Sequence, residues 1–437
     1  MGRIVFPSVA QDRGAGYWLR PGNSWAARRK FLRPDYSVDW RDGFESPEQR
    51  TSTRSVPIST LHRRNPADAF RFLILGDTGE GDRSQYGLLP LIRGLKPDFL
   101  IINGDLAYPA GNWNDFRAGF FEPYRNLNMP IWAVPGNHEY YSDDNGLLFF
   151  ELFCTERFRA RWEEYGLLHR CQPGTYWELR HERDRQPFIV IGVDTLKKAN
   201  LDGRGIGHRE DTNQHEWLRW RLGLADREGG RVMILFHIPA LVGAKHAGST
   251  NLKELHRIIA EHACVKLVVC GHEHNFQSYA PNVFEAYLRQ QVGVHAIASK
   301  PAYFVSGGGG AYLAATDFGD GDYRGSVYPS REQWKDHASA GERVVNRLGF
   351  GKWALGKVVG WISQGAQVDG DAARYLSLLL VDVDRAGSAK VSPVYLDDLE
   401  ALFNHLPEGL VVNVQDNIAP NESEVQRCVQ DRLSLII

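Results

Sequence analysis

Short apolar runs that alternate with amphipathic stretches constrain the fold of this 437-residue chain more than any other feature. Bounded runs of this length are typical of buried β-strands, and amphipathic stretches are typical of surface helices. Strands are predicted at 71–75, 99–102, 131–134, 188–193, 232–236 and 266–269. Helices are predicted at 84–94, 114–126, 213–225 and 251–262. This alternation predicts an α/β fold with buried strands.

A polar motif follows five of these strands. The motifs are LGDTG from Leu75, GDLAY from Gly104, PGNHE from Pro135, FHIP from Phe236 and GHEH from Gly271. Ligands of open α/β sheets bind beyond the carboxyl ends of the strands, where loops bring distant residues together. We therefore expect the polar residues of the five motifs to share one site.

The residue types in these motifs indicate a metal site. They supply the carboxylates of Asp77 and Asp105, the amide of Asn137 and the imidazoles of His237, His272 and His274. This mixture suits Zn, Fe or Mn better than calcium, which prefers an all-oxygen shell. One Asp after a strand is more often a turn residue or a helix cap, so the inference depends on the whole set. A glycine beside each Asp allows a sharp turn and a close approach.

Two cations about 3.5 to 4 Å apart can hold an attacking oxygen and phosphoryl oxygens together. One carboxylate must then bridge them, and a metal-bound hydroxide can form at mild pH because the cations lower the pKa of water. The set of motifs therefore predicts an enzyme, a metal-dependent hydrolase of phosphate esters.

Composition excludes several other classes. The formal net charge of −2 gives no electrostatic case for nucleic acid or an acidic membrane as the main partner. The partner expected from the predicted reaction is a small phosphorylated substrate. The five cysteines are an odd number without a CxxC pair, which indicates neither a disulfide framework nor a zinc knuckle. No apolar leader or transmembrane run is evident, so we expect a cytoplasmic protein. The oligomeric state is not predicted.

We expect four segments along the chain. Residues 1–66 form a basic extended arm, 67–311 the catalytic core, 312–372 an insertion, and 373–437 a closing hairpin of the core with a C-terminal tail. Residues 352–364 have helical apolar spacing. A helix packed on the core is favoured there over a lid or an interfacial membrane helix.

The order of GDTG, GDLAY, GNHE, FHIP and GHEH resembles the calcineurin-like metallophosphoesterase superfamily over roughly residues 70–310. Tyr108 in GDLAY is similar to the purple acid phosphatase branch. The stretch HIPALVGAKHAGST, with His246 nine residues after His237, resembles the small mammalian-type acid phosphatases. The resemblance implies a two-sheet α/β sandwich with helices on its outer faces.

The resemblance also implies roles for individual residues. One metal, Fe(III), would take Asp77, Asp105, Tyr108 and His274. A second, divalent metal, Fe(II), Zn or Mn, would take Asp105, Asn137, His237 and His272, so that Asp105 bridges the pair. His138 and His246 would act on the substrate or its leaving group as hydrogen-bond donors or a general acid.

Several alternatives stay open. The acid phosphatase pattern implies a phosphomonoesterase; a phosphodiesterase acting on cyclic nucleotides or phospholipid headgroups would share every ligand, and a non-catalytic scaffold could keep the fold. Tyr108 could instead pack against the sheet, with Mn or Zn in place of iron. Glu139 is expected to orient His138, and Asp194 either supports the site or caps a helix. The remaining histidines, His169 among them, lack partner spacing and are read as structural or surface residues.

Overall fold

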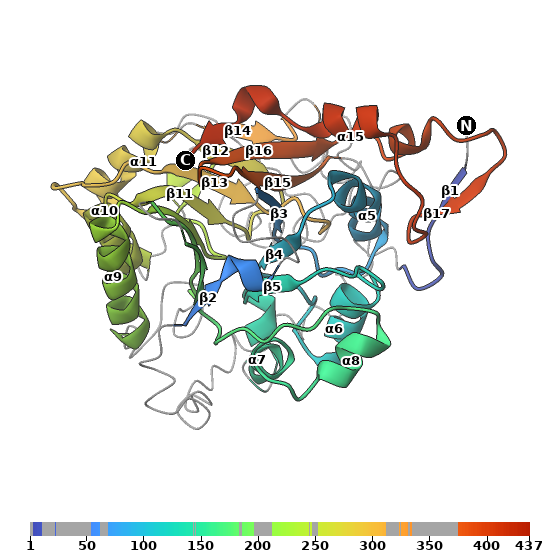
Figure 1. The fold of residues 1–437 in the computed structure, drawn as a ribbon, viewed down its shortest axis with the longest axis horizontal. Coiled ribbons are helices and arrows are strands. Elements are labelled where there is room, and N and C mark those ends of the chain that lie inside the picture. Colours follow the sequence, from blue (N-terminus) through green and yellow to red (C-terminus); the bar gives the residue numbers. More distant parts are fainter. Residues whose placement is uncertain are drawn as a thin grey trace, which may run out of the picture.

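The computed structural model describes two large sheets packed face to face, with helices outside both (Figure 1). The residues described are 3–10, 22, 54–61, 69–142, 144, 146–182, 186–195, 212–243, 245–246, 252–311, 323, 325–330, 333 and 375–437. This arrangement confirms the predicted two-sheet α/β sandwich.

The first sheet has six strands, in the order β18-β16-β15-β3-β4-β5. Its parallel part consists of β3 (Phe70–Leu75), β4 (Phe99–Asn103) and β5 (Ile131–Val134). The predicted hairpin is present as β15 (Leu376–Val383) and β16 (Ala389–Leu396), and β15 pairs antiparallel with β3. The short β18 (Leu435–Ile436) completes the edge. The C-terminal region is therefore part of the sheet that carries the first three motifs.

The second sheet has eight strands, in the order β14-β12-β13-β11-β8-β7-β6-β2. Their bounds are β2 (Ser55–Pro57), β6 (Trp177–His181), β7 (Phe188–Gly192), β8 (Arg231–Leu235), β11 (Val265–Cys270), β12 (Phe276–Tyr279), β13 (Ala302–Ser306) and β14 (Ser326–Tyr328). Two edge strands come from segments with other expected roles, because β2 lies within the N-terminal arm and β14 within the expected insertion. Two small ribbons pair β1 (Arg3–Val5) with β17 (Val411–Asn413), and β9 (Leu241–Val242) with β10 (Lys245–His246).

Helices cover the outer face of each sheet. The six-stranded sheet carries α5 (Arg83–Leu95), α6 (Trp113–Phe116), α7 (Leu147–Cys154), α8 (Arg159–Glu164) and α15 (Glu422–Cys428). The eight-stranded sheet carries α9 (Thr212–Arg227), α10 (Lys253–Glu261) and α11 (Pro281–Tyr287). Short 3-10 helices are η1 (Ile58–Thr60), η3 (His138–Tyr140), η6 (Glu400–Phe403) and η7 (Asp431–Leu433); η2 (Arg117–Phe121) and η5 (Leu288–Val292) are π-helical.

Three apolar cores hold these layers together. Side chains alternate along β3, so that Phe72 and Ile74 enter the core between the sheets while Leu73 and Leu75 face the helices. Between the sheets, the rings of Phe72 and Phe99 stack with their centroids 4.8 Å apart. Apolar runs are needed on β3 because both faces of this strand are buried, which is why the sequence shows continuous rather than alternating hydrophobicity.

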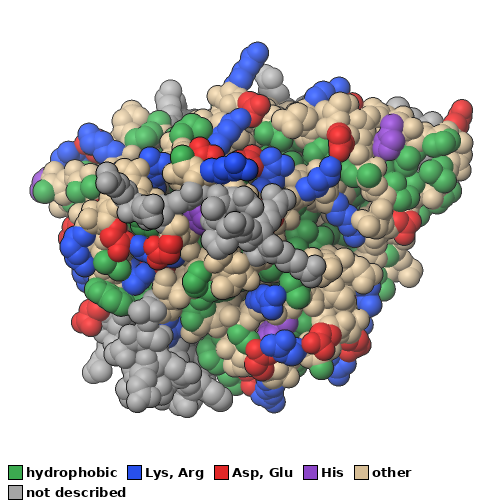
Figure 2. All heavy atoms as spheres, viewed as in Figure 1, with side chains coloured by type: hydrophobic (Ala, Val, Ile, Leu, Met, Phe, Trp, Pro, Cys, Tyr) green, Lys and Arg blue, Asp and Glu red, His purple; other side chains and the backbone are tan. Residues whose placement is uncertain are grey.

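Two further expectations concern the surface. Figure 2 shows Lys and Arg side chains interspersed with Asp and Glu over the described part of the visible face, in keeping with the formal net charge of −2. Among the described residues, no helix is both long and apolar enough to cross a membrane. The amphipathic helix expected at 352–364 lies outside the residues that the structure describes.

Candidate metal centre

The five motifs meet where the two sheets present the carboxyl ends of their strands. The loops after β3, β4 and β5 come from the six-stranded sheet, and the loops after β8 and β11 come from the eight-stranded sheet. Backbone hydrogen bonds tie neighbouring loops together: the N–H of Asp77 donates to Gly104 O at 3.0 Å, and that of Gly271 donates to His237 O at 2.9 Å. The site is thus built jointly by both sheets.

Three of the predicted ligands have backbone conformations that are rare for residues with a side chain. The φ angles of Asp77, Asp105 and His272 are 59°, 54° and 73°. Positive φ is costly for such residues and is concentrated at functional sites. A Cβ atom on Gly104, whose own φ is 88°, would lie 2.2 Å from Nδ1 of His237. The loops therefore turn sharply and pack closely in order to direct these side chains inward.

The first group of side chains consists of Asp77, Asp105, Tyr108 and His274. The phenolic oxygen of Tyr108 lies 3.1 Å from Asp105 Oδ2, 3.1 Å from His274 Nε2 and 3.4 Å from Asp77 Oδ1. His274 Nε2 is 3.4 Å from Asp77 Oδ1. The hydroxyl of Tyr108 thus points at the other three side chains, although the residue is buried. Ligand atoms of Asp77, Asp105 and His274 are close enough together to hold one metal ion.

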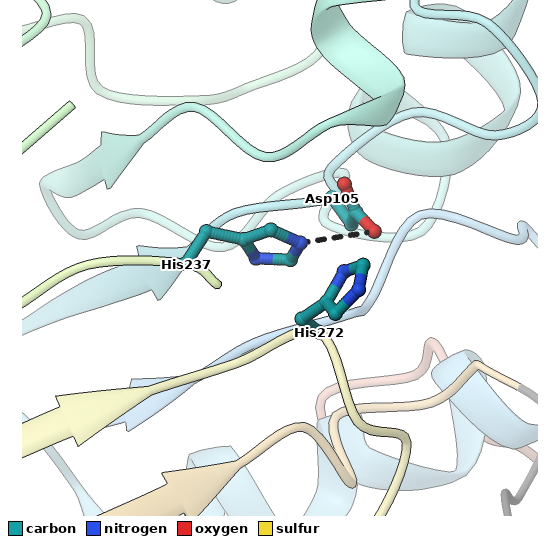
Figure 3. Close-up of side chains that lie close together, drawn as sticks. All are labelled: Asp105, His237 and His272. Carbon is teal, nitrogen blue, oxygen red and sulfur yellow. Dashed lines mark ion pairs between the residues drawn. The ribbon is translucent and has the colours of Figure 1, made fainter. Parts of the chain in front are cut away.

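The second group consists of Asp105, Asn137, His237 and His272. Asn137 Oδ1 lies 3.0 Å from His237 Nε2 and 2.8 Å from His272 Nδ1. His237 Nε2 is 3.3 Å from Asp105 Oδ2, and Figure 3 shows both imidazole rings beside the Asp105 carboxylate. Asp105, His237 and His272 could also hold one metal ion. Asp105 therefore belongs to both groups.

The arrangement of hydrogen-bonding atoms fits a cation. Nδ1 of His237 lies 3.0 Å from the carbonyl oxygen of Asn103, which can only accept, so this nitrogen carries the proton. Among the described residues, the polar atoms that Nε2 of a neutral His237 faces are acceptor oxygens of Asn137 and Asp105. A proton or a metal ion is needed among these three acceptor atoms. The residues present thus suit a metal ion, with Asn103 fixing the ring of His237.

The charges of the groups agree with this fit. Burial on its own would lower the pKa of His237, but the Asp105 carboxylate raises it to about 10. Burial would likewise raise the pKa of Asp105, whereas the neighbouring His237 and His138 hold it well below its usual range. Burial and the charge of His237 together lower the pKa of His272 to about 3. Asp105 thus attracts positive charge to the position shared by both groups.

Of the two histidines expected to contact substrate, the structure describes the side chain of His138 but only the backbone of His246. Nδ1 of His138 lies 2.7 Å from the carbonyl oxygen of Pro109, and its Nε2 faces the centre, 4.0 Å from Asp105 Oδ2. His246 lies in β10, where its backbone pairs with Leu241. The side chain of His246 lies outside what the structure describes.

The expectation that Glu139 orients His138 is wrong. Glu139 Oε1 accepts from the N–H groups of Leu106 and Ala107, and Oε2 accepts from those of Asp105 and Gly136, at 2.6 to 3.0 Å. This buried carboxylate therefore holds the loop that carries Asp105. The pattern GNHE suggested a neighbour in sequence, but η3 turns Glu139 away from its neighbour and toward the preceding motif.

Asn103 is a site residue that the sequence reasoning missed. Its Nδ2 donates to Phe236 O at 3.2 Å and Val269 O at 3.1 Å, so it joins β4 to the ends of β8 and β11. Its sequence signal is an amide at the end of the apolar run FLIIN, just before the Gly-Asp pair. Asp194, for which two roles were open, accepts from the hydroxyl of Tyr140 at 2.6 Å and thus contacts the segment after His138.

Comparison with known proteins places these motifs in a family. The model of the calcineurin-like phosphoesterase family matches residues 70–276, a range that includes every residue of both groups. The chain is 33% identical over 186 residues to a probable cyclic nucleotide phosphodiesterase of Synechococcus, a match covering 41% of this chain and 58% of that protein. It is 21% identical over 285 residues to tartrate-resistant acid phosphatase type 5 of Sus scrofa, covering 59% and 74%.

A third relative is a probable glycerophosphodiester phosphodiesterase of Arcobacter nitrofigilis, 24% identical over 185 residues, with 41% of this chain and 57% of the relative covered. The chain thus spans less than two thirds of the length of two of these three relatives. Phosphatases and phosphodiesterases both occur among them. The five motifs and the match of residues 70–276 to the calcineurin-like phosphoesterase model agree with each other.

Proposed function

We propose that this protein is a metal-dependent hydrolase that cleaves small phosphate monoesters at a centre of two metal ions. The observation that carries the proposal is the sharing of Asp105 between two groups of metal-ligand side chains. A shared carboxylate is what a paired centre requires, because one bridging ligand must contact both ions. The family and its phosphatase relative support the same class of reaction.

The two groups differ in the ions that they suit. Asp77, Asp105 and the phenolate of Tyr108 would supply three anionic ligands, which favours Fe(III) in the first group. The second group adds to Asp105 only a neutral amide and two imidazoles, which suits a divalent ion such as Fe(II), Zn or Mn. When bound, such a pair polarises phosphoryl oxygens and lowers the pKa of water.

The side chains of this chain would then bind and orient the substrate. Nδ1 of His138 lies beside the Pro109 carbonyl, and its Nε2 faces the centre, 4.0 Å from Asp105 Oδ2. A protonated Nε2 would donate to the phosphoryl or leaving-group oxygen. We assign the same kind of role to His246 because of its place in the HIPALVGAKHAGST stretch. Asn103 and Glu139 hold the loops in the geometry that this chemistry needs.

Phosphodiester hydrolysis is the alternative that a specific observation favours. Two of the relatives described above are named as probable phosphodiesterases, one of cyclic nucleotides and one of glycerophosphodiesters. The ligand set does not distinguish the two reactions. The orientation of the Tyr108 hydroxyl toward Asp105 supports the monoesterase, since this Tyr is the feature that resembles the purple acid phosphatases. A non-catalytic scaffold would not need the complete set of ligands.

Paired initial rates test the proposal. Metal-replete protein is assayed on p-nitrophenyl phosphate and on bis(p-nitrophenyl) phosphate, at mildly acidic and at neutral pH. We expect faster cleavage of the monoester. Faster cleavage of the diester would replace the monoesterase by the alternative, and hydrolysis of neither ester would contradict both. The visible spectrum of the same sample tests the metal assignment, because a tyrosinate bound to Fe(III) absorbs visible light whereas Zn and Mn do not.

A further inference from the structure

A second cluster of metal-ligand side chains lies on elements that carry none of the five motifs. Glu156 lies between α7 and α8, and His169 and Cys171 lie in the segment after α8. One ligand atom from each of the three residues falls within 4.8 Å of the other two. Figure 1 shows α7 and α8 together on the helical face outside the six-stranded sheet. The cluster combines a carboxylate, an imidazole and a thiol.

The orientation of His169 is the first argument for a ligand. Nε2 of His169 lies 3.2 Å from the carbonyl oxygen of Leu152, which can only accept, so Nε2 carries the proton. Nδ1 then presents a lone pair. This nitrogen is buried and has no hydrogen-bond partner among the described residues, and only 1% of the side chain is exposed. A metal-ligating histidine commonly has this arrangement, with its other nitrogen donating to a backbone carbonyl.

The surroundings of Nδ1 are the second argument. It lies 3.6 Å from Oε2 of Glu156, so two atoms with lone pairs face each other in the cluster. A proton or a cation between them would resolve this contact. The sulfur of Cys171 belongs to the same group, so three ligand atoms within 4.8 Å of one another converge on one position. A cation can bind all three atoms at once, whereas a proton can join only two of them.

Cys171 and Glu156 complete the set. The thiol of Cys171 donates to Oε1 of Glu156 at 3.2 Å. Glu156 is open to solvent, with 58% of its side chain exposed, so water has access to a further coordination position. The guanidinium of Arg159 lies 2.5 Å from Oε2 of Glu156. Arg159 is itself half exposed and can turn into water when a cation competes for the carboxylate.

We infer that Glu156, His169 and Cys171 form a separate site for one borderline-soft divalent cation, Zn²⁺ in the first place. Sulfur, nitrogen and oxygen ligands together favour zinc over magnesium, calcium or manganese, and three protein ligands leave a fourth position to water. The cation would fix the turn before α8 to the segment that follows α8, joining residues 15 apart in sequence. This site shares no residue with the paired centre.

Binding is coupled to loss of one proton. The thiol of Cys171 gives up its proton to solvent as the metal–sulfur bond forms, and no redox step is involved. Burial and the neighbouring Glu156 together raise the pKa of this thiol to about 12, so the free site holds the thiol form at neutral pH. Metal binding therefore releases one proton below that pKa, and the apparent affinity should rise about tenfold for each unit of pH.

Cobalt(II) substitution tests the inference. Cobalt(II) bound to a thiolate gives a near-ultraviolet charge-transfer absorption, and neither group of the paired centre contains a cysteine. Chelator-stripped full-length protein is titrated with cobalt(II), and we expect this absorption to account for one of about three equivalents bound per chain, the other two lying in the paired centre. Zinc added afterwards should remove it. Cys171→Ser should lose the absorption and one bound equivalent, while hydrolysis of phosphate esters is retained.

Cys428→Ser is the matched control, because Cys428 is also partly buried but lies on α15, outside the cluster. It should keep the absorption. His169→Gln should lose it, and Cys171→Ser keeps the test valid if His169→Gln fails to fold. The inference is overturned if the wild-type protein shows no thiolate absorption, or if Cys171→Ser shows the same absorption as the wild type.

Discussion

The two sheets contribute different chemistry to the proposed paired centre. The loops of the six-stranded sheet carry the oxygen atoms that we propose as ligands, on Asp77, Asp105, Tyr108 and Asn137. The loops of the eight-stranded sheet carry the proposed nitrogen ligands, on His237, His272 and His274. Each group draws on both sheets, so neither sheet alone can form a complete group. The centre therefore depends on how the two sheets pack against each other. Substitutions can disturb Asp105 and the loop that carries it, the hydrogen bonds between the sheets, or the aromatic side chain of Tyr108.

Asp105→Asn should have the largest effect because it removes the carboxylate that both groups share. We expect a fall of about a thousand-fold in kcat/KM and loss of bound metal, since metal stabilisation of transition-state charge amounts to several kcal/mol. Metal analysis and initial rates on the same samples measure both effects. Asp431→Asn, at a half-exposed carboxylate paired with Lys390, should change neither. Loss of metal with full activity would contradict the assignment.

Glu139→Gln should weaken metal binding by disturbing the loop that carries Asp105, without removing a ligand. The amide keeps one acceptor oxygen but turns its NH₂ toward backbone N–H groups that now donate to a carboxylate. We expect metal affinity to fall by about 10- to 100-fold, as for other residues that position ligands. Titration of the stripped variant with metal gives this ratio. Affinity equal to that of the wild type would show that the loop around Asp105 does not need Glu139.

Asn103→Ala should remove side-chain hydrogen bonds that join β4 of one sheet to β8 and β11 of the other. It leaves the carbonyl of Phe236 without the amide donor. The Val269 carbonyl still accepts from the N–H of Phe236, and the Asn103 carbonyl that holds His237 remains. An unsatisfied buried acceptor costs about 1 to 3 kcal/mol, so the metal-free variant should unfold at a lower temperature. Thermal unfolding of stripped protein isolates this effect from metal binding. An unchanged midpoint would mean that other contacts hold the two sheets in register.

Tyr108→Phe should have the smallest effect on rate and the clearest effect on colour. The substitution removes only the hydroxyl that faces Asp77, Asp105 and His274, and it keeps the buried ring. With iron in the first group, we expect the visible absorption to disappear while both metals remain bound. The rate should change by about tenfold or less, since one ligand of several is lost. A colourless wild-type enzyme with full activity would instead favour Zn or Mn in that group.

The motifs predicted much of the fold and the fact that their polar residues lie close together. Buried strands on both sides of the sandwich were visible because they must be apolar along their whole length, and each motif follows such a strand. Edge strands such as β2 and β14 were not visible, since three residues give no period. The partners of Glu139 were mispredicted because they depend on backbone N–H groups rather than on side-chain types. His169 was read as structural for a similar reason, as its significance lies in the orientation of its ring.

Metal reconstitution tests the central claim most directly. Stripped protein carrying Cys171→Ser, which leaves the paired centre as the metal site under study, is titrated with Mn²⁺ while hydrolysis of p-nitrophenyl phosphate is followed. The account predicts no activity in the stripped protein and full activity only at about two bound equivalents, because Asp105 must hold both ions. Full activity at one equivalent, or activity without metal, would contradict a paired centre.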